Sequence, residues 1–453
     1  MSKESIKQLI RDIYTLISLL VAFVSAILLW FWNVGPGWKK GYFGTRTLLI
    51  VGILYSVVYM IFAKMYKAHK IGAYHLTELA FSQVLAYGIG NMALFVAAFF
   101  WFHNFKRIKV SLFILVFLLQ IMGISLVIFV MNRLHAKYDE PRRMMIIYGS
   151  DQYKLLLRKI KAVSYRYNVL ACYDQKEDRA KIRKVLDKCQ DVYVCDVDLH
   201  FRHELIMYCD VRHIDIHFSM GIEDIIVRSS DVSHYFDTPF LRNKKAEEAW
   251  YYPAAKRMTD IILSLIGLLI ASPFMLITAI AIKIEDGGSI LYKQKRLTVD
   301  GKRFYIYKFR SMRENSEKSA RLATANDDRI TAVGNVIRRF RIDEIPQLFN
   351  ILKGDMSIVG PRPERPEIAH EYEKELPEFV MRLKVKAGLT GYAQIYGKYN
   401  TTPLDKLMLD LIYISQRSVL MDLKIMFYTV KILFMPESTE GVSDKQKTAK
   451  PIL

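Results

Sequence analysis

Four long apolar runs without a charged residue dominate the first third of the chain. Each approaches the roughly 20 residues that a helix needs to cross a bilayer. The lack of charge within them argues against an ion or proton path and favours an anchor. We therefore predict a bundle of four transmembrane helices within residues 1–137, with the runs at Ile13–Trp32, Thr47–Ala63, Leu79–Phe102 and Val110–Met131.

After residue 137 the pattern changes to short β-rich runs that alternate with helical stretches, as is typical of a small doubly wound parallel sheet. The first run leads only into Gly149-Ser150, without the glycine-rich turn of a dinucleotide site. Residues 138–230 are therefore predicted as a degenerate or regulatory Rossmann-like α/β module, and residues 231–255 as a linker. The expected strands are Met144–Tyr148, Val169–Tyr173, Val192–Val197 and Asp215–Ser219, with helices around 152–163, 178–189 and 200–211.

A fifth apolar run, Ile261–Ile282, is interrupted near its middle by Ser272-Pro273. A proline inside a helix removes one backbone hydrogen bond and clashes with the preceding turn. Two topologies follow: a kinked helix that spans the membrane, or a helix-break-helix hairpin that enters one leaflet and returns. From the residues alone we favour the spanning helix, because lipid-exposed backbone at a break is costly unless other protein covers it.

Charge is unevenly distributed along the chain. The 453 residues carry a formal net charge of +20 and are 52% hydrophobic, which excludes an intrinsically disordered chain. Residues 1–137 carry +11, residues 138–253 carry 0 and residues 254–453 carry +9. The neutral middle argues against nucleic acid as a partner, and the basic ends indicate membrane surfaces and phosphates. The cysteines Cys172, Cys189, Cys195 and Cys209 form no C-x-x-C pair, so we expect reduced, packed thiols.

A pair of adjacent carboxylates, Asp343-Glu344, stands out in the last block of the chain. It follows three arginines, and Pro346 restrains the backbone two residues later. An isolated Asp-Glu pair is usually a solvated surface feature. Cationic neighbours, however, favour ionised carboxylates, and a carboxylate can act as a nucleophile or hold Mg²⁺.

Two further features surround this pair in the sequence. The runs Ile290–Arg296 and Arg303–Lys308, joined across Asp300-Gly301, predict a β-hairpin that leads into Lys308-Phe309-Arg310-Ser311-Met312. Arg362 lies between two prolines, and its planar guanidinium suits phosphate oxygens. Taken singly, each of these features would only suggest a phosphate site.

Together the motifs resemble one family, the bacterial polyprenyl-phosphate sugar phosphotransferases, or monotopic phosphoglycosyl transferases. The resemblance runs through about residues 250–435, and the whole layout is similar to the large members that initiate capsule or exopolysaccharide synthesis. Ala387 departs from the pattern, because many relatives have proline there. The motifs are Lys256-Arg-x-x-Asp260, Ser272-Pro273, Lys308–Met312, Asp343-Glu344-x-Pro-Gln347, Gly360-Pro-Arg-Pro363, Gly388-Leu-Thr-Gly-Tyr-Ala-Gln394, Asp410, Tyr413 and Asp422.

The resemblance implies a two-step exchange with UDP-sugar and polyprenyl (undecaprenyl) phosphate as substrates. Asp343 would attack the β-phosphate, release UMP and form a covalent phosphosugar–aspartyl intermediate, which the lipid phosphate would then attack. Glu344 would assist by orienting or deprotonating the lipid phosphate, and Mg²⁺, with Asp343 as a ligand, would neutralise the diphosphate. The expected phosphate-binding residues are Lys308, Arg310, Arg338, Arg362 and Gln347.

The resemblance also reverses the expected topology of the fifth run. It implies a re-entrant hairpin over residues 256–284, broken at Ser272 and Pro273, within a mainly helical monotopic catalytic domain over 256–436. That domain would face the cytoplasm from the bacterial cytoplasmic (inner) membrane, with a flexible tail over 437–453. The lipid bilayer is an expected partner, and a homodimer built through the N-terminal regions fits the layout.

Two other classes of function compete with this one. The first is a catalytically idle membrane scaffold for polysaccharide assembly, against which the intact Asp343-Glu344 argues. The second is a membrane-tethered NAD-dependent nucleotide-sugar dehydratase, suggested by the α/β middle. It lacks both the glycine fingerprint and a Tyr-x-x-x-Lys pair placed to serve that sheet.

Overall fold

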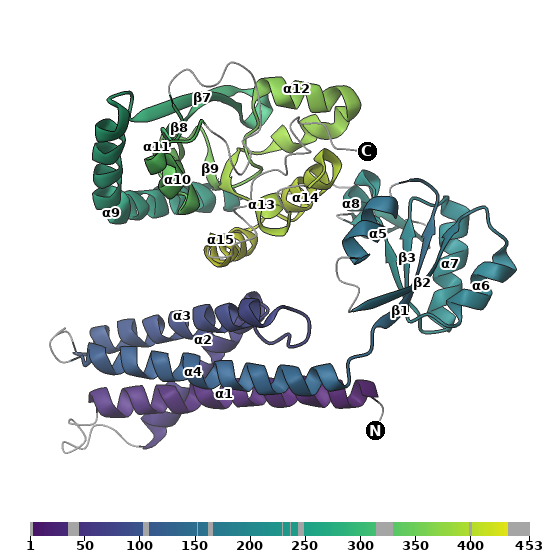
Figure 1. The fold of residues 1–453 in the computed structure, drawn as a ribbon, viewed down its shortest axis with the longest axis horizontal. Coiled ribbons are helices and arrows are strands. Elements are labelled where there is room, and N and C mark those ends of the chain that lie inside the picture. The colour runs from purple at the N-terminus through teal and green to yellow at the C-terminus, as the bar shows by residue number, and fades with distance from the viewer. Residues whose placement is uncertain are drawn as a thin grey trace. The chain divides into compact units, whose positions relative to one another are not determined.

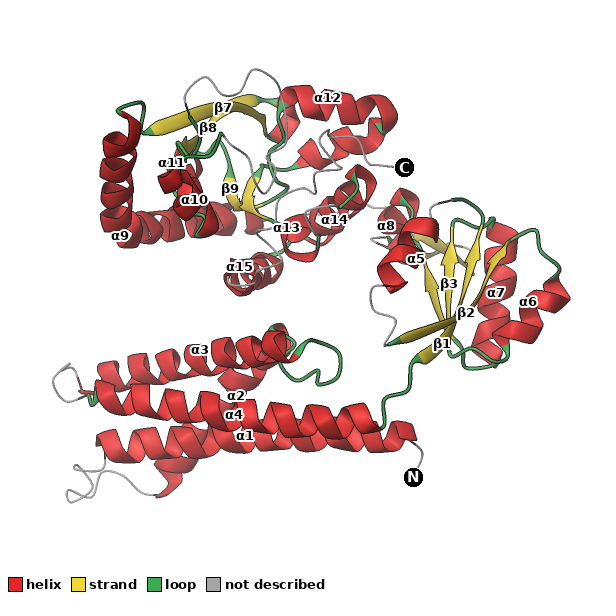
Figure 2. Cartoon of the chain, viewed as in Figure 1, coloured by secondary structure: helices red, strands yellow, loops and turns green. Residues whose placement is uncertain are grey.

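The computed structural model divides into two compact units, Met1–Met220 and Gly221–Leu453, which are described separately. Figure 1 traces the chain through them and Figure 2 marks their helices and strands. The structure describes residues 3–34, 45–102, 108–151, 153–161, 166–228, 230–235, 237–242, 249–313, 329–397 and 401–433. The tail expected over 437–453 lies outside these residues.

The first unit begins with four long helices, as the apolar runs predict. By length and composition each is able to cross a membrane. Each helix extends beyond the apolar run that predicted it at one end or both, since helical geometry continues through flanking polar residues. Their bounds are α1 (Lys3–Val34), α2 (Thr45–Met65), α3 (Leu76–Phe102) and α4 (Val110–Lys137).

Buried polar side chains link these four helices. Gln83 of α3 donates from Nε2 to the Tyr14 hydroxyl of α1 at 2.7 Å, and accepts at Oε1 from the Tyr59 hydroxyl of α2 at 2.8 Å. A second group joins Asn91 to Gln120 at 2.8 Å, and Gln120 to Ser25 at 2.6 Å. Because hydrocarbon offers no hydrogen bonds, such groups must be satisfied within the bundle.

The rest of the first unit is an α/β module around a four-stranded sheet in the order β2-β1-β3-β4, in which every pair is parallel. This is the arrangement that alternating strands and helices predict. The buried strand residues pack into cores that include Cys189, Cys195 and Cys209. The bounds are β1 (Arg142–Tyr148), α5 (Tyr153–Lys161), β2 (Tyr167–Asp174), α6 (Arg179–Leu186), β3 (Asp191–Cys195), α7 (Leu199–Val211) and β4 (Asp215–Phe218).

The second unit begins with helix α8 (Ile222–Arg228) and an antiparallel hairpin of β5 (Asp231–Tyr235) and β6 (Thr238–Arg242). This hairpin occupies the segment expected to be an unstructured linker. Its alternation is masked because β6 is exposed along its whole length and buries no apolar face.

Helix α9 (Tyr252–Asp286) contains the fifth apolar run and continues through Ser272 and Pro273 rather than breaking there. Its ribbon turns sharply partway along (Figure 1), and a proline inside a helix is the usual cause of such a kink. Its first half is held by Arg257, which donates to the carbonyls of Ile351 and Leu352 at 2.7 Å each. At its other end the Glu285 carboxylate accepts from the backbone N–H of Ala332 at 2.8 Å.

The catalytic part expected after α9 folds as a hairpin followed by short helices. Strands β7 (Leu291–Leu297) and β8 (Arg303–Phe309) pair antiparallel across a turn at Asp300-Gly301, as predicted. Two three-residue strands that lack a periodic signal, β9 (Ser357–Val359) and β10 (Gly388–Thr390), pair in parallel. The helices are α10 (Ala332–Arg339), α11 (Gln347–Lys353), α12 (Pro366–Glu375), α13 (Tyr392–Tyr396), α14 (Pro403–Gln416) and α15 (Val419–Leu433).

Candidate active site

The Asp343-Glu344 pair lies on a single 3₁₀ turn, Ile342–Glu344, between the end of α10 and the start of α11. Both flanking helices pack against α9, and the 3₁₀ turn also packs against β8. Pro346 adopts helical dihedrals immediately before α11, as expected for a residue that pre-sets φ. The two carboxylates are therefore fixed by packed elements on each side.

Three cations surround the Glu344 carboxylate. Lys308, at the end of β8, donates from Nζ to Oε1 at 2.9 Å, and Arg362 donates from Nη2 to the same oxygen at 3.2 Å. Arg341 Nη1 lies 3.7 Å from Oε2. Three segments that are far apart in the sequence thus meet at one carboxylate, as the predicted phosphate site requires.

The two carboxylates differ in their protonation. Burial alone would raise the pKa of Glu344, but Lys308, Arg362 and Arg341 together outweigh it and hold the pKa well below its usual range. For Asp343 the balance is opposite. Burial and the Glu344 charge raise its pKa, and Lys308, Arg338 and Arg362 only partly oppose them. Glu344 is therefore a permanent anion, while Asp343 titrates.

The other sequence-predicted residues occupy three environments. Arg338, on the last turn of α10, is near enough to Asp343 to lower its pKa. Arg310 is buried, and its guanidinium lies against Gly288, where a Cβ would meet Nη1 at 1.9 Å. Gln347 is buried at the start of α11. The structure thus groups Lys308, Arg338 and Arg362 around the carboxylates, and places Arg310 and Gln347 in the protein interior.

The loop that carries Arg362 is held at each of its carbonyl groups. The backbone N–H of Gly388 donates to Pro361 at 2.9 Å, and that of Leu297 to Glu364 at 3.0 Å. Two guanidinium groups complete the set: Arg382 donates to the Arg362 carbonyl at 2.9 Å and Arg296 to the Pro363 carbonyl at 3.1 Å. Two prolines and four hydrogen bonds leave this segment little freedom, so the Arg362 side chain projects from a rigid base.

Arg382 belongs to a buried ionic network behind the loop. Its side chain is 3% exposed and pairs with Asp410, 1% exposed, at 2.7 Å and with Glu364 at 3.4 Å. Lys406 also pairs with Glu364. Burial raises the pKa of Asp410, and Arg382 and Lys406 oppose this. The charges of the network fix the position of the Arg382 guanidinium against the Arg362 backbone.

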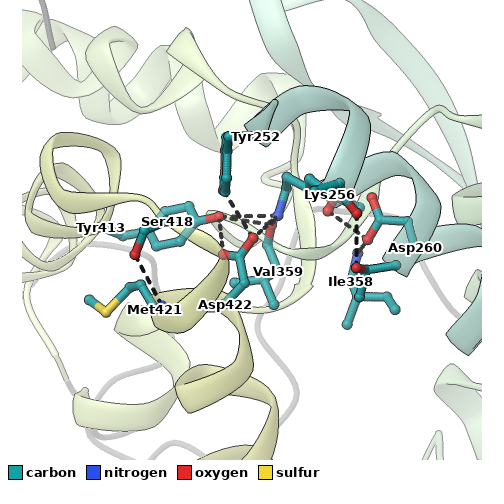
Figure 3. A network of polar contacts seen from close by, with 12 residues as sticks. Tyr252, Lys256, Asp260, Ile358, Val359, Tyr413, Ser418, Met421 and Asp422 are labelled. Atoms are coloured by element: carbon teal, nitrogen blue, oxygen red, sulfur yellow. Dashed lines mark hydrogen bonds and ion pairs between the residues drawn. The ribbon is translucent and has the colours of Figure 1, made fainter. Parts of the chain in front are cut away.

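A second network anchors the start of α9 behind the same loop. Figure 3 shows Tyr252, Lys256 and Tyr413 gathered around the Asp422 carboxylate. It accepts from Lys256 at 2.8 Å, Tyr252 at 2.9 Å and Tyr413 at 2.8 Å. Lys256 also donates to the Val359 carbonyl at 3.0 Å, at the end of β9.

Asp260 completes the attachment of α9 by accepting from the Ser357 hydroxyl at 3.0 Å and the Ile358 N–H at 2.9 Å. Lys256 and Asp260 lie on successive turns of α9, and both bind β9. The Lys-Arg-x-x-Asp motif therefore fastens the membrane helix to β9, which leads into the Gly360–Pro363 loop, and, through Arg257, to α11.

Comparison with known proteins agrees with this site. The family model described as bacterial sugar transferase matches residues 251–436. The UDP-glucose:undecaprenyl-phosphate glucose-1-phosphate transferase of Caulobacter vibrioides is 38% identical over 190 residues, which are 40% of this chain and 71% of that protein. The chain belongs to the bacterial sugar transferase family.

Two other relatives show how much of the chain this family accounts for. The UDP-N-acetylgalactosamine-undecaprenyl-phosphate N-acetylgalactosaminephosphotransferase of Aeromonas hydrophila is 36% identical over 229 residues. The match covers 50% of this chain and spans 53%, about half, of that protein's length. The galactosyl transferase CpsE of Streptococcus agalactiae is 29% identical over 399 residues, 78% of this chain and 86% of that protein. The latter similarity extends well beyond the transferase part.

The carboxylate pair fits the Mg²⁺ expected for this family member only as a partial ligand set. Among the described residues no group of three or more His, Cys, Asp or Glu side chains could hold a metal. Mg²⁺ commonly uses one or two carboxylates together with substrate phosphates and waters. Asp343, whose raised pKa a nearby cation would lower, suits such a shared site, and Glu344 is already matched by Lys308 and Arg362.

Sequence reasoning missed the residues that hold the Arg362 loop in this transferase, Arg296 and Arg382. Each is a single basic residue with no local pattern, and their partners are distant in the chain. Arg296 reaches Pro363, 67 residues away, and Arg382 reaches the Arg362 carbonyl 20 residues away. The one available signal is that Arg296 lies on the same strand face as Gln294 and Tyr292, which predicts that its side chain points inward.

Proposed function

We propose that this protein transfers a sugar 1-phosphate from a UDP-sugar to polyprenyl (undecaprenyl) phosphate, as the first membrane step of a capsule or exopolysaccharide. Two observations support the proposal. The relatives are named for transfer of sugar phosphates to undecaprenyl phosphate. In the structure, one carboxylate of intermediate burial, Asp343, lies beside Glu344 among cations contributed by β8, α10 and the Arg362 loop. This juxtaposition is the observation that carries the proposal.

In the first step a carboxylate oxygen of Asp343 forms a bond to the β-phosphorus of the UDP-sugar. The bond from that phosphorus to the bridging oxygen breaks, and its electron pair leaves with UMP. In the second step an oxygen of the lipid phosphate attacks the same phosphorus. The bond to Asp343 breaks, and the free carboxylate returns. Polyprenyl-diphosphate-sugar and UMP are the products.

The cations divide naturally between two roles in this scheme. Lys308, Arg338 and Arg362 offset the charge that gathers when a diphosphate meets two carboxylates. Mg²⁺, held by Asp343 and substrate oxygens, would supply further positive charge. Since the pKa of Glu344 is held low, it is a poor general base near neutral pH. Its proposed role is therefore to orient Lys308 and Arg362 toward the phosphates.

The topology proposed for α9 is a re-entrant hairpin with the transferase part on the cytoplasmic side, where nucleotide sugars are present. The contacts of both its ends with the same small unit support this, since Arg257 and Glu285 each hold a helix beside Asp343. A reporter fused after residue 290 should read cytoplasmic. An external signal would exclude the hairpin. The α/β module is proposed to be regulatory, and the N-terminal helices to bring copies of the chain together.

The reaction is tested by following UMP release and the mass of the protein. Full-length protein in nanodiscs should release UMP from at least one of UDP-glucose, UDP-galactose and UDP-N-acetylgalactosamine. Without lipid acceptor, the intact protein should gain the mass of one sugar phosphate. Asp343→Asn should abolish both signals, while Asp300→Asn, on the exposed turn of the hairpin, should retain them. Undiminished UMP release by Asp343→Asn would refute the assignment of the nucleophile.

A further inference from the structure

Helix α10 ends in an unusual way, next to the carboxylate pair. Its last residue is Arg339, Phe340 is the cap, and Arg341 follows in the left-handed region with φ 54° and ψ 25°. Helices that end through this region usually place glycine there, because a side chain crowds the backbone. The neighbouring helices α9 and α11 do so, with Gly287 at φ 71° and Gly354 at φ 94°.

An arginine at this position is therefore retained at a conformational cost. Residues held in sparsely populated regions of the backbone map gather at functional sites. The direction of inference runs from the observed backbone to the role of the side chain. If the turn alone mattered, glycine would make it with less strain, so the guanidinium of Arg341 is the feature to explain.

Pairing with Glu344 does not explain it fully. Arg341 lies 3.7 Å from Glu344 Oε2, beyond a normal hydrogen bond, whereas Lys308 and Arg362 bind Oε1 at 2.9 and 3.2 Å. The charge of Glu344 is thus matched by two closer cations. The Arg341 guanidinium stays 34% exposed and lies two residues before Asp343.

We propose that Arg341 binds a substrate phosphate beside Asp343 and that its strained backbone serves to place the guanidinium there. The planar fork of arginine suits two phosphate oxygens, and the rigid turn fixes its direction. The phosphate belongs either to the diphosphate of the UDP-sugar or to the lipid acceptor, which share this chemistry. The inference rests on the proposed function and adds a binding residue to it.

The test compares variants of the full-length protein in nanodiscs. Arg341→Gly removes the guanidinium and relieves the backbone, so it should raise the unfolding temperature by about 2 to 4 °C while raising one KM by about 10-fold or more. A higher KM for UDP-sugar identifies the nucleotide diphosphate as the ligand, and a higher KM for polyprenyl phosphate identifies the lipid. Arg341→Lys keeps the charge and should recover part of the lost affinity.

A matched control is Arg339→Ala, an exposed arginine two residues earlier in helical backbone, which should leave both KM values within about 2-fold. Unchanged KM values in Arg341→Gly would overturn the inference. So would a loss of activity that is fully recovered at higher pH, because Arg341 would then act only through the ionisation of the carboxylates. If the wild type releases no UMP from any UDP-sugar, the proposed function fails first and the inference falls with it.

Discussion

Replacing Arg382 with methionine tests whether the buried ionic network positions Arg362. The change keeps much of the side-chain volume but removes one charge of a nearly dry pair, since Arg382 is 3% and Asp410 1% exposed. Removing one partner of a buried ion pair costs about 3 to 5 kcal/mol, because the other charge is left uncompensated. For a folding unit of about 200 residues, this corresponds to a fall in unfolding temperature of roughly 6 to 15 °C.

The size of that loss should depend on pH. Burial already raises the pKa of Asp410, and Arg382 is the largest influence opposing it. A carboxyl whose pKa is raised on folding favours the folded state while it is protonated and loses that contribution as pH rises through the shifted pKa. Arg382→Met raises this pKa further. The deficit of the variant should therefore be smaller at pH 5.5 than at pH 8.

The assay is thermal unfolding of the full-length protein in detergent at both pH values, together with UMP release in nanodiscs. Lys384→Met, an exposed neighbour, serves as control. The double variant Arg382→Met with Asp410→Leu should regain stability, because no buried charge is left unpaired, but should not regain activity, because the Arg362 carbonyl still lacks its donor. An unfolding temperature of Arg382→Met within about 2 °C of wild type at pH 8 would refute this reasoning.

Three further predictions concern other contacts. Lys308→Met should move the acidic limb of the pH–rate profile to higher pH, because Lys308 lowers the pKa of both Asp343 and Glu344; an unmoved limb, as expected for exposed Lys302→Met, would contradict the shared electrostatics. Asp260→Ala should cost about 2 to 3 kcal/mol by removing the acceptor of Ser357 and Ile358, measured as a lower unfolding temperature; an unchanged value would show that α9 is held elsewhere. Gln83→Leu should destabilise the bundle by about 1 to 2 kcal/mol in SDS-induced unfolding, whereas lipid-facing Met92→Leu should not.

Much of the architecture follows from periodicity. The four N-terminal helices, the parallel sheet and the β7–β8 hairpin all have runs long enough for an apolar pattern to be recognised. The β9–β10 pair could not be recognised, because three residues carry no period. The continuous helix through Pro273 was also not expected, since proline disfavours a helix interior and the sequence does not show the packing that compensates for it.

The candidate site was predictable only where its residues cluster in the chain. Asp343 and Glu344 were recognisable by their adjacency, and Lys308 and Arg362 by motif, and the structure brings these last two onto Glu344. The supporting contacts were not predictable from one sequence. Lys256 and Asp422 are 166 residues apart, and nothing local in either segment indicates a partner. Arg341 was visible as a basic residue, but its left-handed backbone was not.

The attachments of α9 bear on how the transferase part can be studied apart from lipid. Arg257 satisfies the terminal carbonyls of α11, and Glu285 satisfies the first N–H groups of α10. The helix that carries the apolar surface thus also closes the ends of the two helices on either side of Asp343. A water-soluble fragment made by deleting residues 252–286 would expose these helix ends as well as remove the anchor. A better route to a soluble enzyme keeps α9 and replaces only its outward leucines and isoleucines.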